Sequence, residues 1–186
     1  MPEFPLIISQ SIPDSLYSSL EDELKDNWSL NNISFPGKPV AWTTFDKDSL
    51  IYFECATIIK YKIEKYLKKR LRLIRIHVNG QTSAQVTGFH KDFPEDNVWT
   101  AVFFFGPFWD LNWGGEFVCA NPHNNTFHYA PYIPNTTCVI PSNWDHYGSS
   151  PNHMTDRLRI TIAFSYCLSS DFYDMMEKYP GIKKYQ

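Results

Sequence analysis

The spacing of apolar residues changes near residue 70, and this change restricts the possible folds more than any other feature of the chain. Before that point, apolar side chains recur at helical spacing over residues 14–25 and from Ser49 to about residue 70, with Asp14 and Ser49 as the expected N-caps. After it, β-prone runs bounded by Gly, Pro, Asn and Asp predict strands over residues 71–78, 98–105, 116–120, 126–129, 137–140 and 157–166. A loop or short edge strand is expected over residues 31–48, and a short helix over residues 170–178. Helices followed by strands are typical of an α+β, mainly β fold, or of a barrel backed by helices.

The length of 186 residues fits a single domain with a full core. Within residues 1–186 we expect mainly helical support over 1–70, a β core over 71–167, and a C-terminal helix and tail over 168–186. The 14 Phe, 11 Tyr and 6 Trp residues favour strands and a packed β core. A formal net charge of −3 gives no general attraction to nucleic acid or to an anionic membrane.

The N-terminal segment and the cysteine spacing indicate where the protein is located and the state of its thiols. The N-terminal residues lack the basic start and apolar run of a signal peptide, and no apolar stretch is long enough to span a bilayer. We therefore expect a soluble, cytoplasmic protein that does not bind membranes. The four cysteines form no CxxC pair and no zinc-knuckle spacing, so buried, reduced thiols are expected.

Two segments carry potential metal ligands. In His90-Lys91-Asp92, an extended backbone would project the imidazole and the carboxylate to the same side, within reach of one ion. A second histidine, His146, follows an apolar strand, and His153 is its competitor as the third ligand. Two histidines and one carboxylate are the ligand set of non-haem iron(II) oxygenases. The alternative is a surface turn at His90 and a loop hydrogen bond at His146.

An arginine on the last predicted strand is the third feature of interest. Residues Arg157, Arg159 and Thr161 share one face of this strand, and apolar residues share the other. An arginine that faces the interior of a barrel is unfavourable unless it meets an anion, and its guanidinium suits a carboxylate. A salt bridge to Asp156 at the strand rim is the alternative, and it fits Arg157 better than Arg159.

In their order and spacing, these residues resemble the iron(II)- and 2-oxoglutarate-dependent oxygenases, specifically the prolyl-4-hydroxylase-like branch. The resemblance covers about residues 75–166 and includes an Asn-Trp-Gly-Gly-Glu-Phe segment at 112–117 and an Arg-Ile-Thr-Ile-Ala-Phe segment at 159–164. It implies a double-stranded β-helix (jelly roll) with N-terminal supporting helices.

The resemblance also implies roles for individual residues. His90, Asp92 and His146 would bind Fe(II). Arg159 would hold the distal carboxylate of 2-oxoglutarate, with Thr161 beside it and Arg157 as the second choice.

Two positions depart from the family pattern. His77 stands where members often have a tyrosine that binds the co-substrate. Phe104 replaces a second tyrosine, and Thr100 is the candidate for the missing polar contact.

The implied function is a dioxygenase that hydroxylates a protein side chain, as prolyl hydroxylases do, or a free amino acid. It would consume O2 and 2-oxoglutarate, release succinate and CO2, and use ascorbate as a candidate reductant. The alternatives are a nucleic-acid-modifying oxygenase, a cupin-like metal protein and a silent binding module. The basic run over residues 60–75 is interpreted as a solvated helix face, so a protein or small-molecule substrate ranks above nucleic acid. We expect the ten aromatics at positions 89–117 to form the wall and mouth of the pocket.

Overall fold

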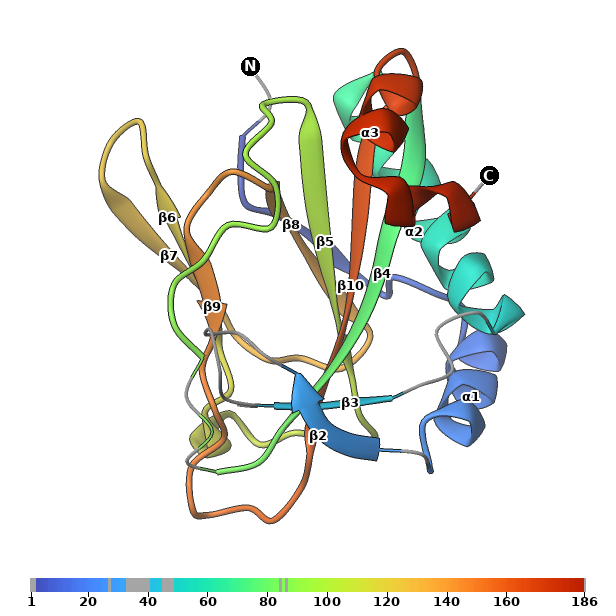
Figure 1. Ribbon diagram of the computed structural model, residues 1–186. Coiled ribbons are helices and arrows are strands. Elements are labelled where there is room, and N and C mark those ends of the chain that lie inside the picture. Colours follow the sequence, from blue (N-terminus) through green and yellow to red (C-terminus); the bar gives the residue numbers. More distant parts are fainter. Residues whose placement is uncertain are drawn as a thin grey trace.

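The computed structural model describes residues 3–26, 28–32, 41–44, 49–83, 85 and 87–185. Within these residues, the strands form two antiparallel sheets (Figure 1). In spatial order, the larger sheet contains β1 (Leu6–Ser9), β8 (Thr136–Pro141), β5 (Val98–Phe105), β10 (Arg159–Leu168), β4 (Leu71–Gln81), β3 (Ala41–Thr44) and β2 (Trp28–Asn32). The smaller sheet contains β7 (Thr126–Ala130), β6 (Phe117–Asn121) and β9 (His146–Gly148).

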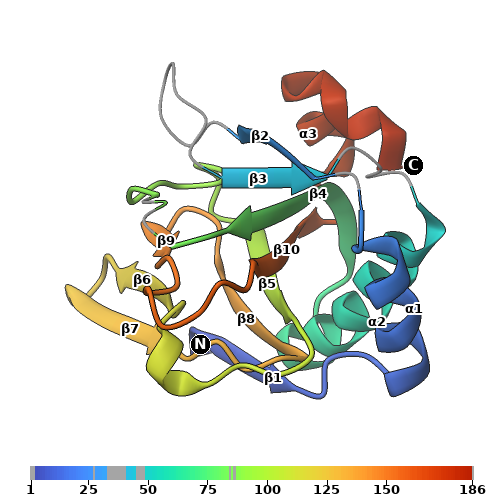
Figure 2. The ribbon, with the colours of Figure 1, turned by 90° about the horizontal axis from the view of Figure 1, so that it is seen from below.

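Helices cover one face of the larger sheet, and the smaller sheet faces the other. Helices α1 (Asp14–Glu23) and α2 (Leu50–Leu67) lie on the outer side, away from β6, β7 and β9 (Figures 1 and 2). The chain ends with α3 (Phe172–Lys178) and a 3-10 helix, Pro180–Tyr185, and a second 3-10 helix, Leu111–Trp113, precedes β6. Two facing antiparallel sheets with supporting helices make a double-stranded β-helix, so the predicted fold class is confirmed.

The two long helices form because their apolar residues recur every three or four positions. The buried face of α2 contains Tyr52, Cys55, Ala56, Ile59, Ile63 and Leu67. The N-cap prediction for α1 is wrong, because Pro13 occupies the cap and Asp14 is the first helical residue. The Asp14 carboxylate, in the first turn, still interacts favourably with the positive end of the helix dipole. Ser49 caps α2 by position, without a side-chain hydrogen bond.

The central strands β5 and β10 divide the core into two parts. Strand β5 is buried at every position, as expected for a central strand covered on both faces, and its bounds match the predicted ones. Phe103 and Phe164 pack under the helices, whereas Val102 and Phe104 face the smaller sheet. The inner face of these strands therefore leads into the space between the sheets.

The short strands β1 and β9, and most of β2, were not predicted. These strands have at most five residues each, too few for a clear alternation of apolar and polar side chains. The predicted loop or edge strand over residues 31–48 includes β3 and part of β2, and its residues 33–40 and 45–48 lie outside the described residues. In the described part of the chain, no helix has the length and apolar character needed to cross a membrane.

All four cysteines are free and buried, as predicted. Cys119 and Cys138 lie in the apolar cluster between the sheets, and Cys55 lies on the buried face of α2. Burial raises the pKa of Cys119 to about 12 and that of Cys138 well above its usual value. These thiols are therefore protonated at neutral pH.

Candidate active site

Two histidines and one aspartate converge between the sheets. His90 and Asp92 belong to the segment between β4 and β5, and His146 begins β9. Potential ligand atoms of the three side chains all lie within 4.8 Å of one another. Backbone hydrogen bonds join the two segments, from His90 N to His146 O at 3.1 Å and from His146 N to His90 O at 3.0 Å. This isolated backbone bridge thus brings the segment before β5 and the start of β9 together.

Both imidazoles are oriented by backbone carbonyls. His90 Nδ1 lies 3.0 Å from Gly88 O, and His146 Nδ1 lies 2.9 Å from Trp144 O. Because a carbonyl oxygen only accepts, each Nδ1 is the donor of its pair, and Nε2 is the ring nitrogen left to face a metal ion. Burial and the neighbouring His146 lower the pKa of His90, which favours the neutral imidazole that a metal ion requires.

Asp92 is held as a carboxylate by its neighbours. Its side chain is 5% exposed; Oδ1 accepts from Arg75 Nη1 at 3.0 Å and Oδ2 accepts from Thr100 Oγ1 at 2.8 Å. Burial alone raises the pKa of Asp92, but His146, Arg75 and Thr100 together hold it well below its usual range. The triad therefore offers two imidazole nitrogens and one carboxylate oxygen.

Thr100 differs from its predicted role as a contact to the co-substrate. Its buried hydroxyl is bonded to Asp92 and to Ser142 Oγ at 2.8 Å, and it does not line the cavity described below. Thr100 is thus placed to orient the Asp92 carboxylate. Its hydroxyl contributes to the cavity only through Asp92, which lines it.

We expect Thr100→Val to lower the metal affinity about 10- to 100-fold, because valine keeps the shape and removes the hydrogen bond that orients Asp92. Titration with Mn(II), followed by electron paramagnetic resonance, measures the change. Thr100→Ser keeps the hydroxyl and is the control. Equal affinities for the valine variant and the unchanged protein would contradict this role.

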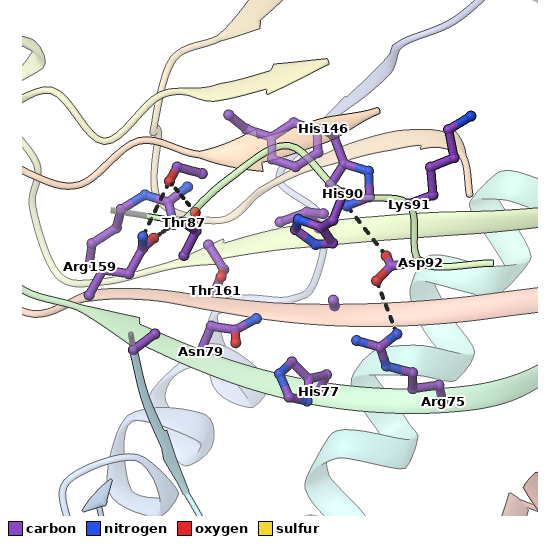
Figure 3. A pocket seen from close by; sticks show the side chains of 16 residues that line it. Arg75, His77, Asn79, Thr87, His90, Lys91, Asp92, His146, Arg159 and Thr161 are labelled. Atoms are coloured by element: carbon purple, nitrogen blue, oxygen red, sulfur yellow. Dashed lines mark hydrogen bonds and ion pairs between the residues drawn. The ribbon is translucent and has the colours of Figure 1, made fainter. Parts of the chain in front are cut away.

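A cavity of about 360 Å³ opens beside the triad (Figure 3). Strand β4 lines it with Arg75, His77, Asn79 and Gln81, at alternate positions, and β10 lines it with Arg159, Thr161 and Ala163. The remaining lining residues are Ala41, Thr87, His90, Lys91, Asp92, Val102, Phe117, His146 and Gly148. Most of the lining residues are therefore polar or charged. The expected aromatic wall is wrong, because of the ten aromatics at positions 89–117 only Phe117 lines the cavity.

Arg159 is a buried cation in this cavity wall. It is 2% exposed; Nε donates to Gly115 O at 2.7 Å and Nη1 donates to Gln81 Oε1 at 2.8 Å. Its guanidinium also lies 5.1 Å from the centre of the Tyr132 ring. Burial lowers the pKa of Arg159 to about 10, so it stays charged at neutral pH. Nη2 has no hydrogen-bond partner, and no described acidic side chain forms an ion pair with Arg159.

The competing residues from the sequence lie elsewhere. Arg157 precedes β10, is exposed, and lies over the ring of Trp113 at 5.7 Å. His153 is exposed in the loop between β9 and β10. The structure therefore places His146 and Arg159 at the cavity and leaves His153 and Arg157 outside it. His77 and Thr161 line the cavity together with Arg159.

Glycines make room for the guanidinium. A Cβ on Gly148 would lie 2.9 Å from Arg159 Nη1, and one on Gly115 would lie 3.2 Å from Arg159 Cδ. Gly115 also has φ +88°, a backbone conformation that residues other than glycine rarely adopt. Arg159 can therefore occupy its place only where these two positions lack side chains.

Gly148→Ala should destabilise the protein by about 1–3 kcal/mol, because the new methyl group collides with a guanidinium that two hydrogen bonds hold in place. Unfolding in guanidinium chloride measures the loss. Gly181→Ala is the matched control, since a Cβ there would meet no atom within 4 Å. The prediction fails if both variants unfold at the same denaturant concentration.

Sequence reasoning missed Arg75 and Gln81. The basic run was interpreted as a solvated helix face, yet Arg75 lies on β4 and reaches Asp92. The predicted strand ended at residue 78, before Gln81. Polar residues at every second position from 75 to 81 were the available signal for a polar inner face.

No protein-family model matches the sequence, and no curated protein matches it significantly. Three solved structures show the same fold. The non-haem α-ketoglutarate-dependent epimerase SnoN from nogalamycin biosynthesis has a TM-score of 0.68 at 13% identity, over 90% of this chain and 80% of that chain. HygX from Streptomyces hygroscopicus, with nickel, 2-oxoglutarate and hygromycin B bound, has a TM-score of 0.65 at 14% identity, over 88% of this chain and 82% of that chain.

The third structure is a prolyl hydroxylase from Trichoplax adhaerens in complex with a peptide of hypoxia-inducible factor. It has a TM-score of 0.65 at 13% identity, over 89% of this chain and 84% of that chain. The chain thus has the double-stranded β-helix fold of 2-oxoglutarate- and iron(II)-dependent oxygenases over most of its length.

Proposed function

We propose that this protein is an iron(II)- and 2-oxoglutarate-dependent dioxygenase. The observation that carries the proposal is that one cavity is lined by the His90, Asp92 and His146 triad and by a buried arginine that forms no ion pair with a described residue and whose Nη2 has no hydrogen-bond partner. The triad supplies a cation site, and Arg159 requires an anion in the same space. A co-substrate that chelates a metal ion and carries a second carboxylate satisfies both.

The donor set fits iron(II). Two histidines and one carboxylate are the ligand set that would hold iron(II) on one face and leave its other coordination positions open. When bound, iron(II) with 2-oxoglutarate supplies dioxygen activation, with succinate and CO2 as co-products and ascorbate as a candidate reductant. The protein supplies the ligands, their orientation and the shape of the cavity.

The charged and polar residues of β4 and β10 would orient the co-substrate. Arg159 would bind the distal carboxylate through Nη2, and Thr161 on the same face of β10 would donate a further hydrogen bond. His77, which lies opposite Ala163 on the neighbouring strand, would donate to the other end. Because the cation is fixed before the ligand arrives, binding is directional.

The primary substrate would be a protein side chain, as in prolyl hydroxylases, or a free amino acid. The cavity volume lies in the range of small-molecule sites and leaves room beside a five-carbon dicarboxylate. One structural neighbour holds a peptide and another holds hygromycin B, so the fold accommodates both kinds of substrate. Arg159 favours this function over a cupin-like metal protein, which has no need for an anion site.

Anaerobic addition of Fe(II) and 2-oxoglutarate tests the proposal. We expect a visible metal-to-ligand charge-transfer band, and succinate formation once air is admitted. Asp92→Ala should abolish both signals because it removes the negative ligand. A protein that shows neither the band nor succinate would refute the proposed function.

A further inference from the structure

The hydrogen-bond partner of Arg159 inside the cavity wall is uncharged. Gln81, at the end of β4, is 3% exposed, and its Oε1 accepts from Arg159 Nη1 at 2.8 Å. A buried guanidinium is usually paired with a carboxylate. Here an amide takes that place, so it holds the side chain without neutralising its charge.

The orientation of the Gln81 amide is fixed from its other end. Nε2 donates to Gly148 O at 3.2 Å and to Gln85 O at 3.4 Å. Because both partners are carbonyl oxygens, a flipped amide would place oxygen against oxygen. Oε1 therefore has to face Arg159.

Three contacts together leave one part of the guanidinium available. Gly115 O takes Nε, Gln81 takes Nη1, and the Tyr132 ring covers one face. Nη2 is the nitrogen without a hydrogen-bond partner. The position of Gln81 thus decides which nitrogen is left for a ligand.

We propose that Gln81 is a positioning residue that fixes the Arg159 guanidinium without forming an ion pair with it, and that selection of a co-substrate with a second carboxylate depends on it. This inference rests on the proposed function. A glutamate at position 81 would form a buried ion pair with Arg159 and would remove the demand for an anionic ligand. The neutral amide leaves the guanidinium charge for an anionic ligand to pair with.

The test compares two ligands that differ only at the distal end. 2-Oxoglutarate carries the second carboxylate, and 2-oxopentanoate has a methyl group in its place. Each is titrated anaerobically into the Fe(II)-loaded protein and followed by the charge-transfer band. We expect Gln81→Glu to weaken 2-oxoglutarate binding about 10- to 100-fold and to leave 2-oxopentanoate binding nearly unchanged.

Gln85→Glu is the matched control. It makes the same substitution in the neighbouring loop, where the side-chain oxygen accepts from Thr82 N at 2.7 Å and can still do so as a carboxylate. This variant should keep the preference for 2-oxoglutarate. A general loss of structure would weaken both ligands equally, so the ratio of the two affinities isolates the effect at Arg159.

Gln81→Met covers the case in which the glutamate variant does not fold. It stays neutral and loses only the hydrogen bond, so we expect about a 2- to 10-fold weaker binding of 2-oxoglutarate. An unchanged preference for 2-oxoglutarate in the Gln81 variants that fold would overturn the inference. Absence of 2-oxoglutarate binding in the unchanged protein would instead refute the proposed function.

Discussion

His146→Ala is expected to lower the affinity for divalent metal more than about 100-fold and to abolish succinate formation. The imidazole is buried, its tautomer is set by Trp144 O, and it is the one ligand contributed by the smaller sheet. Without this imidazole, only His90 and Asp92 of the three proposed ligands remain. Metal affinity is measured by anaerobic Fe(II) titration calorimetry and turnover by succinate release.

The matched control for this variant is His153→Ala, which removes a histidine from the exposed loop after β9. Its metal affinity and turnover should equal those of the unchanged protein. If His153→Ala loses the metal and His146→Ala keeps it, the assignment of the third ligand is wrong.

Arg159→Met should weaken 2-oxoglutarate binding roughly 100-fold or more, because the distal carboxylate would lose its buried counter-charge. Methionine retains most of the apolar stem, so the walls of the cavity keep their support. The metal affinity should change little, since Arg159 forms no described hydrogen bond or ion pair with the triad. The charge-transfer band, titrated with 2-oxoglutarate, measures the loss.

Arg157→Met is the control for this second prediction. Arg157 is exposed and contacts the ring of Trp113, two features that do not bear on the cavity. We expect normal binding of 2-oxoglutarate in this variant. Weak binding in Arg157→Met together with normal binding in Arg159→Met would reverse the assignment.

Two of the long strands were predictable from the sequence. The β-prone run at 98–105 forms β5 with the predicted bounds, and the arginine and threonine of β10 were correctly separated from the apolar residues between them. The convergence of His90, Asp92 and His146 was expected because the order of motifs resembles that of a known family. Physical spacing alone would have left it open, because the backbone bridge that joins them spans more than fifty residues.

The remaining features depend on tertiary contacts that no local pattern encodes. Thr100 and Val102 share a face of β5, but only the packing of Ser142 decides that the hydroxyl bonds to Asp92. The aromatics fill the two apolar clusters on either side of the larger sheet, so polar residues are left to line the cavity. The place of Gln81 in the cavity wall could not be predicted, because β4 continues three residues beyond its predicted end.

The burial of the cysteines has a consequence for the choice of metal. Cys119 lies opposite His146 in the register of β6 and β9, yet its thiol is protonated at neutral pH. A thiol has to lose its proton before it can coordinate, and thiolates are the donors that soft ions such as copper(I) prefer. The potential ligand atoms that lie together at this site are those of His90, Asp92 and His146, which are nitrogen and oxygen. We therefore expect the site to disfavour thiophilic metals relative to iron(II).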